Sequence, residues 1–368
     1  MAQPPRVAVV GGGIAGTLCS LVLKNRGINP TLIDGGRRSA GRLRNDGAQF
    51  LRAADPRLIP VYGMLERQGL LKEWKGRFGM LGSSGGGFLP AEIVTANTRH
   101  GGSTQGMEKQ KSVAGSTADD YQTASDAGDF CHFVGSAAVP TFVGAPSMTD
   151  LCPEILRLAG VEQVNNSSLV GATLEDGGWC LDVQDNNNGT PSQRIAPDAK
   201  FDALVLATHD PSLASGAILS IVDGEIKAGG YSSKEDAAEK GGDASIVIER
   251  LSEMADSLQK VRDHERMPVY SVSITYPEGF SQSIPFDAVS VPGSIVVQFL
   301  VSDESKPSPE NSAGEGWTAI TTSQLASAIL SRPEMSDEER LALVSKNSYE
   351  RNRTTLFVLS WWHGTRAP

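Results

Sequence analysis

The stretch that decides the fold reads Val7-Ala8-Val9-Val10-Gly11-Gly12-Gly13-Ile14-Ala15-Gly16. An apolar, β-branched run ends in three glycines, and a helix-compatible segment, residues 17–25, follows at once. We therefore expect a strand-to-helix turn. In such a turn Gly11 permits the tight bend, Gly13 leaves room for a pyrophosphate beside the backbone, and Gly16 lets the helix pack closely on the strand. The phosphates would lie against free N–H groups at the positive end of the helix.

A second apolar run, residues 31–33, ends in an acid, Asp34. A carboxylate at this spacing accepts hydrogen bonds from both ribose hydroxyls of an adenosine and repels a 2′-phosphate. The alternative is a glycine-rich loop without function. Because the strand, the helix and the terminal acid agree, the sequence predicts a dinucleotide site.

Length and composition limit the other possibilities. A chain of 368 residues is long enough for two domains or one elaborated domain. The net charge of -10 argues against a nucleic-acid partner, and no apolar run reaches the roughly 20 residues of a membrane span. No signal peptide is expected. The cysteines are widely spaced, without a metal or redox motif, so we expect a reduced compartment, the cytoplasm or an organelle matrix. They are Cys19, Cys131, Cys152 and Cys180.

A basic loop follows Asp34 and contains Ala40-Gly41-Arg42. Gly41 would allow close approach of the backbone, and Arg42 offers a fixed fork of donors for a pyrophosphate or an anionic flavin ring. The alternative is a solvated basic loop. Small residues then lead to an amide and an aromatic, Gln49 and Phe50.

In this order of elements the chain resembles the renalase-like branch of the amine-oxidase superfamily of FAD proteins. The family's Gly-Gly-Arg element reads Ala-Gly-Arg at residues 40–42, and its Gly-Ala-Gln-aromatic element occupies residues 47–50. By this resemblance Ala15, Arg42, Gln49 and Phe50 would contact FAD, together with the glycines and Asp34. The predicted cofactor-binding residues are Gly11, Gly13, Ile14, Ala15, Gly16, Asp34, Gly41, Arg42, Gln49 and Phe50.

The resemblance implies an α/β fold, with a Rossmann-like FAD-binding domain and an interleaved α+β substrate domain built on an antiparallel sheet. An apolar run, residues 201–208, is expected to return to the first domain as a buried parallel strand. The expected divisions are a first FAD-binding part, 1–75; a substrate-domain part, 76–144, with a disordered polar insert, 95–129; a second FAD-binding part, 145–222; a flexible insert, 223–245; and the rest of the substrate domain, 246–346.

The C-terminal residues 347–368 are expected to be an incomplete end. Members of the superfamily close with a Gly-Asp pair and a last helix whose N-terminus faces the flavin, and these residues supply neither. The resemblance therefore covers about residues 6–330, apart from the inserts.

The predicted function is that of an FAD-dependent oxidoreductase. The flavin would accept a hydride from a reduced nicotinamide or an amine and pass electrons to dioxygen or another acceptor. Two alternatives remain, a non-catalytic or impaired remnant and an NAD-dependent dehydrogenase with the same glycine fingerprint. The sequence identifies no catalytic acid or base and no metal site, and it predicts a small-molecule substrate as the partner.

Overall fold

The computed structural model describes residues 4–43, 47–52, 55–81, 88–91, 139–187, 193–195, 200–263, 268–307, 315–336 and 338–340. The chain divides into two compact units, each made of two segments. The first unit contains Met1–Arg44 and Thr149–Glu265, and the second contains Asn45–Met148 and Arg266–Pro368. The predicted insert at 95–129 and the predicted incomplete end at 347–368 lie outside the described residues.

A four-stranded parallel sheet forms the centre of the first unit, in the order β12-β1-β2-β8. Its strands are β1 (Arg6–Val10), β2 (Asn29–Ile33), β8 (Glu162–Val164) and β12 (Ala203–Leu206). The late return of the chain as a parallel strand beside β1 is confirmed. However, β12 (Ala203–Leu206) is shorter than the expected 201–208 and only half-buried, because it is an edge strand of this sheet.

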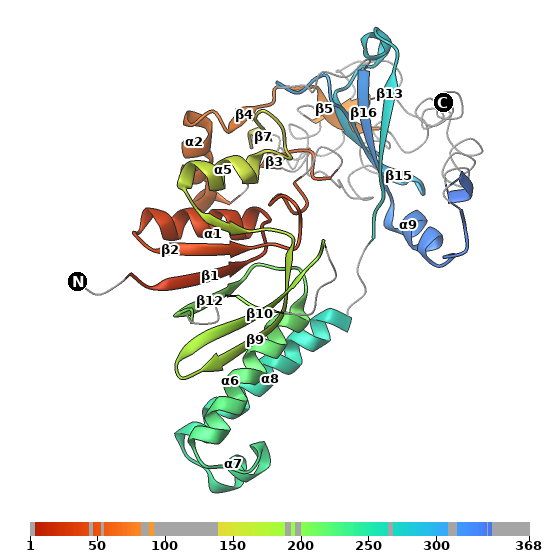
Figure 1. Cartoon of the computed structure of the whole chain (residues 1–368). Helices are drawn as coiled ribbons and strands as arrows, with labels where there is room; N and C mark the ends of the chain where they lie inside the picture. The colour runs from red at the N-terminus through yellow and green to blue at the C-terminus, as the bar shows by residue number, and fades with distance from the viewer. Residues whose placement is uncertain are drawn as a thin grey trace, which may run out of the picture. The chain divides into compact units, whose positions relative to one another are not determined.

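Side chains of alternate residues in β1 point to opposite faces of the sheet, as the strand period requires. On one face Val7 and Val9 pack against helices α1 (Ile14–Asn25) and α5 (Leu151–Ala159). On the other face Ala8 and Val10 pack against strands β9 (Ser167–Glu175) and β10 (Gly178–Asp185) and helix α6 (Pro211–Ala228). The first unit is therefore a three-layer arrangement, which Figure 1 shows with α1 and α5 on one side and β9 and β10 on the other.

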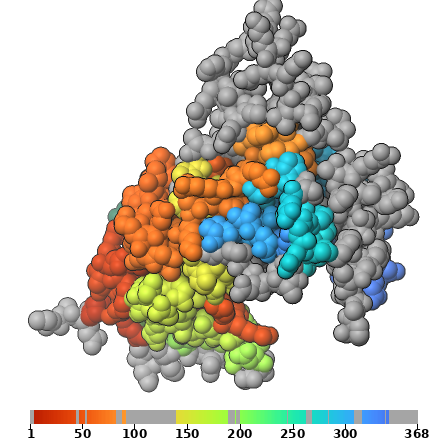
Figure 2. All heavy atoms as spheres, turned by 90° about the horizontal axis from the view of Figure 1, so that it is seen from above, coloured from red at the N-terminus to blue at the C-terminus, as the bar shows by residue number. Residues whose placement is uncertain are grey.

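The third layer is an antiparallel sheet, β11-β10-β9, completed by the short strand β11 (Gln193–Arg194). Residues 162–164, which precede this hairpin in the chain, do not join it; they form β8 and pair with β2 in the parallel sheet. Figure 2 shows the surface of the molecule, where the N-terminal residues (red) lie beside the yellow-green segment that follows residue 149. Segments far apart in the sequence thus build one unit.

Residues 223–245, expected to be a flexible insert, are helical. They contain the end of α6, all of α7 (Lys234–Lys240) and the start of α8 (Asp243–Asp263). The glycine pairs end helices instead of preventing them, since Gly230 and Gly241 have φ of 68° and 66°, values typical of helix C-termini. The buried side chains of Val222, Ala237 and Ile248 join the three helices.

The boundaries between the units also differ from the expected ones. The first unit's N-terminal segment ends near residue 44, where 75 was expected, and residues 246–263, expected in the substrate domain, belong to the first unit as helix α8. The reason is packing, because α8 lies along α6 and shares its buried contacts.

The second unit is built on a six-stranded sheet in the order β13-β16-β15-β14-β5-β6. Every pairing in it is antiparallel except that of β14 with β5. The strands are β5 (Phe78–Leu81), β6 (Phe88–Pro90), β13 (Ser271–Tyr276), β14 (Ala288–Ser290), β15 (Val297–Ser302) and β16 (Glu315–Thr321). A smaller sheet of β3 (Leu51–Arg52), β7 (Thr141–Gly144) and β4 (Leu71–Glu73) accompanies it, with helix α2 (Ile59–Arg67).

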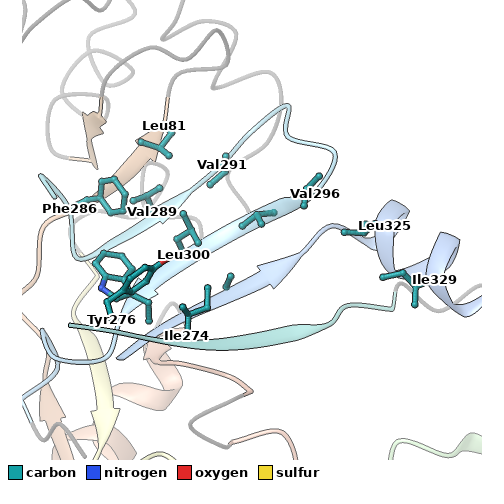
Figure 3. Packing of buried hydrophobic residues seen from close by; sticks show 13 residues of the cluster. Leu81, Ile274, Tyr276, Phe286, Val289, Val291, Val296, Leu300, Leu325 and Ile329 are labelled. Carbon is teal, nitrogen blue, oxygen red and sulfur yellow. The ribbon is translucent and has the colours of Figure 1, made fainter. Parts of the chain in front are cut away.

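One face of the six-stranded sheet carries the core shown in Figure 3, where buried residues of five strands and helix α9 (Ser323–Leu330) gather. Trp317 lies in this core with 1 % of its surface exposed, and its indole N–H donates to Ser281 at 3.1 Å. Tyr276 stacks on Phe280. These aromatics therefore stabilise the second unit.

Replacing Thr322 with alanine should lower the free energy of unfolding of the second unit by about 1 kcal/mol. The Thr322 hydroxyl caps α9 by accepting the N–H of Leu325 at 3.2 Å, and it donates to the carbonyl of Ile295 at 2.7 Å. Urea unfolding measures the change. Thr322→Ser keeps the hydroxyl and should restore stability, and equal losses in both variants would contradict the capping role.

None of the helices in the described ranges combines the length and the apolar composition needed to cross a membrane.

Candidate dinucleotide site

The loop after β1 turns sharply at Gly11, which has a φ of 107°, a conformation that favours glycine. Its N–H donates to the carbonyl of Ile33 at 2.8 Å, which ties the loop to β2. A Cβ at Gly11 would lie 2.5 Å from the carbonyl oxygen of Ala207, at the end of β12. The positive φ and the nearby carbonyl of Ala207 therefore require glycine at this position.

The other three glycines of the loop, Gly12, Gly13 and Gly16, differ in how much space a side chain would have. A Cβ at Gly16 would clash with the carbonyl oxygen of Gly11, and one at Gly12 would lie 2.6 Å from the Asp34 carboxylate. A Cβ at Gly13 would meet only the Cα of Gly41, at 3.9 Å, which is an ordinary contact. Packing against the described residues thus explains Gly12 and Gly16, whereas nothing among those residues requires a glycine at position 13.

Gly13 is the N-cap residue of α1, with extended φ and ψ of -71° and -179°. It has no side chain to cap the helix, and no acidic residue lies in the first turn. The first helical hydrogen bond runs from the N–H of Thr17 to the carbonyl of Gly13, at 3.0 Å. The N–H groups of Ile14, Ala15 and Gly16 therefore precede the hydrogen-bonded part of the helix, at its positive end, where they can bind an anion.

Asp34 follows β2 and is fixed by its own backbone, since its N–H donates to Val164 and its carbonyl accepts from Ser167, both at 2.9 Å. Its side chain is half-buried and extends toward Gly12. The structure therefore brings Asp34 together with the glycine loop, as the sequence predicted for a ribose contact.

Gly41 is also at this loop, although a basic segment separates it from Asp34 in the sequence. It has a φ of 59°, and a Cβ on it would lie 2.8 Å from the Cα of Gly13. The neighbouring Arg42 is exposed, and the part of the chain described here offers no ion-pair partner for its guanidinium. Arg38, in contrast, is paired with Asp150 at 2.6 Å. Arg42 is thus an exposed arginine of this loop without an ion pair to a described residue, and Arg37 is another.

A buried thiol lies beneath this cradle. Burial raises the pKa of Cys152 to about 11, with a hydrogen bond to Thr17 acting against the shift and the negative charge of Asp34 adding to it. The thiol is completely buried on α5. It is therefore a protonated core group that packs the helix layer against the loop.

The free energy of unfolding should fall by about 2 kcal/mol as the pH rises from about 9 to 11, because unfolded Cys152 loses its proton with a pKa near 8.5 while the folded thiol keeps it. Below pH 8 this group contributes no pH dependence. Cys152→Ala should make the stability curve flatter over this pH window. An equally steep fall in that variant would show that other groups cause it.

Gln49 and Phe50 belong to the second unit, whereas the glycines of the loop belong to the first. Gln49 is 3 % exposed, and its side-chain oxygen accepts a hydrogen bond from the ammonium of Lys306 at 2.6 Å. The Phe50 ring contacts Trp74 and Phe299, with centroids 6.3 and 5.9 Å away. Phe50 thus lies in an aromatic cluster with Trp74 and Phe299.

Lys306 had no role in the sequence-based site, although it is the partner of Gln49. The available signal was weak, an Asp and a Lys three residues apart after an apolar run. In the structure Asp303 and Lys306 follow β15 and pair at 2.5 Å. Elsewhere within the described ranges, no group of three or more His, Cys, Asp or Glu side chains is arranged to hold a metal ion.

A scan against protein-family models finds no match, and no curated protein matches the chain. Solved structures match over nearly its whole length. Wild-type putrescine oxidase bound to putrescine matches with a TM-score of 0.54 and 14 % identity, over 96 % of this chain and 83 % of that chain. An oxidoreductase from Methanosarcina mazei matches with a TM-score of 0.54 and 11 % identity, over 92 % of this chain and 84 % of that chain.

At such identities the likeness shows the fold alone. The chain has the fold of these two oxidoreductases. The expected fold class is therefore confirmed, with a Rossmann-like unit around a parallel sheet and a second unit around a largely antiparallel sheet.

Proposed function

We propose that this protein is an FAD-dependent oxidoreductase that acts on a small molecule. The observation that supports this most strongly is the position of Gly13, where the backbone is open and the packing of the protein does not demand a glycine. Open space at the N-terminus of a helix, with uncapped N–H groups and Asp34 beside it, suits the pyrophosphate and ribose of a dinucleotide.

The topology favours FAD over a nicotinamide cofactor. In a plain nicotinamide dehydrogenase, strands and helices alternate without interruption after the glycine loop. Here the chain leaves the first unit after β2, builds part of the second unit, returns with α5 and β8, and adds an antiparallel hairpin before β12. The solved structures with the same overall fold include putrescine oxidase.

Each predicted residue then has a physical task. The N–H groups of residues 14–16 would bind the pyrophosphate, and Asp34 would accept hydrogen bonds from the ribose hydroxyls. Gly41 permits the close approach of its loop, and Arg42 supplies a cation to the phosphates or the ring. By family resemblance, Gln49 and Phe50 would contact the flavin.

FAD supplies the redox chemistry when bound, taking two electrons and a proton from a C–H bond as a hydride. From a reduced nicotinamide, bound FAD would take the hydride of the dihydropyridine ring, and a proton from water would complete the reduction of the flavin. From an amine donor, bound FAD would take the hydride of the C–H bond next to nitrogen, and the loss of an N–H proton would leave an imine. Passing two electrons and two protons to dioxygen would give hydrogen peroxide. The protein binds, orients and shields these reactants.

The experiment is an anaerobic reduction of the protein loaded with FAD, followed by its absorbance at about 450 nm, where oxidised flavin absorbs. Bleaching by NADH identifies a reduced nicotinamide as the donor, and bleaching by putrescine and not by NADH identifies an amine. Admission of air should restore the colour if dioxygen is the acceptor. A flavin that binds but is reduced by neither class of donor would contradict the proposed activity.

A further inference from the structure

Helix α8 of the first unit carries a stripe of exposed apolar side chains. Val247, Met254 and Val261 are 44, 53 and 56 % exposed. Seven residues separate each of them from the next, which is almost two turns of an α-helix, so the three side chains follow one line along the helix. Ile246 is also exposed but lies to one side of this line. We call Val247, Met254 and Val261 the α8 stripe.

The α8 stripe has the spacing of a coiled-coil seam. Leu251 and Leu258 lie between its members, so apolar residues follow one another at steps of four and three from Val247 to Val261. Both leucines are half-buried, and Leu251 packs against the core that joins α8 to α6 and α7. The buried face of α8 therefore continues outward as an apolar edge, along which a second helix can pack knobs into holes.

Charged side chains between Val247 and Val261 are placed to leave this edge uncharged by acids. At about 100° per residue, Glu249, Glu253 and Asp256 lie roughly 100–160° around the helix from the stripe. The chain as a whole has a net charge of -10. Two copies can therefore meet along the stripe without bringing these carboxylates together, which would cost binding free energy.

The α8 stripe is also symmetric about Met254, since one valine lies seven residues before it and the other seven residues after it. A two-fold dimer needs a surface that matches itself in reverse. When two α8 helices pack antiparallel with Met254 at the two-fold axis, Met254 faces Met254 and each Val247 faces Val261 of the other copy. A partner of another sequence, or a membrane surface, needs apolar side chains but not this symmetry.

We propose that the α8 stripe is the contact surface of a homodimer in which two α8 helices pack antiparallel around Met254. A single pair of helices buries less surface than a standard interface, so the dimer is weak, with a Kd of roughly 10 μM. The contact lies wholly on α8 and requires no cofactor. It is therefore independent of the proposed function.

The test is sedimentation velocity of the full chain from about 1 to 200 μM, where the sedimentation coefficient should rise with concentration toward that of a dimer. Met254→Glu and Met254→Lys each place two like charges face to face, and each should raise the Kd at least about tenfold. An equimolar mixture of these two variants should associate again, because each glutamate then faces a lysine. Leu158→Glu is the matched control, since Leu158 on α5 is 50 % exposed and lies outside the stripe, and it should not change the Kd.

The double variant Val247→Glu/Val261→Lys tests the direction of the helices. In the antiparallel dimer each new glutamate faces a new lysine, so association should persist, whereas a parallel dimer would bring like charges together and dissociate. Circular dichroism checks that every variant folds. A wild-type chain that stays monomeric over the whole range, or a mixture of the two Met254 variants that does not associate, would overturn the inference. A monomeric chain that sediments with phosphatidylcholine vesicles through Met254 would assign the stripe to a membrane surface instead.

Discussion

Replacing Gly13 with aspartate should weaken FAD binding by roughly 100-fold or more and leave the protein as stable as before. Gly13 has open space at its Cβ position, and its φ and ψ suit any residue at an N-cap. Aspartate is a better N-cap than glycine, so the free energy of unfolding should be unchanged or a few tenths of a kcal/mol higher. The new carboxylate would occupy the N–H groups and repel the pyrophosphate.

Fluorescence titration with FAD and urea unfolding measure the two effects on the same samples. The control is Gly224→Asp, which adds the same charge where no atom lies within 4 Å, well along α6 from its start at Pro211. FAD affinity should not change in this control. Equal affinities in wild type and Gly13→Asp would show that the glycine loop is not a pyrophosphate site.

Replacing Gly16 with alanine should act mainly on stability, in contrast to Gly13→Asp. It should lower the free energy of unfolding of the first unit by about 3 kcal/mol. A Cβ at this position would clash with the carbonyl oxygen of Gly11, which cannot move without breaking the contact of Gly11 with β2. Alanine favours a helix over glycine by about 1 kcal/mol, so any net loss reflects the clash. FAD binding should weaken only as far as the loop is displaced.

The matched control is Gly216→Ala, the same substitution at an exposed position of helix α6 with open space around it. It should raise stability by up to about 1 kcal/mol. Urea denaturation followed by circular dichroism compares the two variants. If Gly16→Ala raises the free energy of unfolding as much as Gly216→Ala does, α1 does not pack closely on the carbonyl oxygen of Gly11.

Local sequence patterns were sufficient to predict the glycine loop and the strands and helix around it. The apolar run before Gly11 and the terminal Asp34 predict two adjacent parallel strands and a helix, because strand period and glycine spacing are local properties. The order of elements was sufficient for the α/β class. Glycine content misled the interpretation of residues 223–245, where glycine pairs end helices whose buried faces hold them together.

Contacts between residues that are far apart in the chain could not be predicted from the sequence. Lys306 and Gln49 are separated by 257 positions, and nothing in either local pattern predicts their hydrogen bond. The glycine spacing predicts different roles for Gly13 and Gly16, but it could not identify the atom that a Cβ at Gly16 would meet, the carbonyl oxygen of Gly11. Packing likewise places α8 in the first unit, whereas the family resemblance had implied that residues 246–346 belong to the second.

The measurement that tests the central claim most directly is the visible absorption spectrum of the purified, folded chain after incubation with FAD and removal of the unbound cofactor. We predict a yellow protein with an absorption band at about 450 nm and one FAD per chain, and a colourless Gly13→Asp variant. A folded wild-type protein that retains no FAD and shows no saturable binding of it would contradict the account.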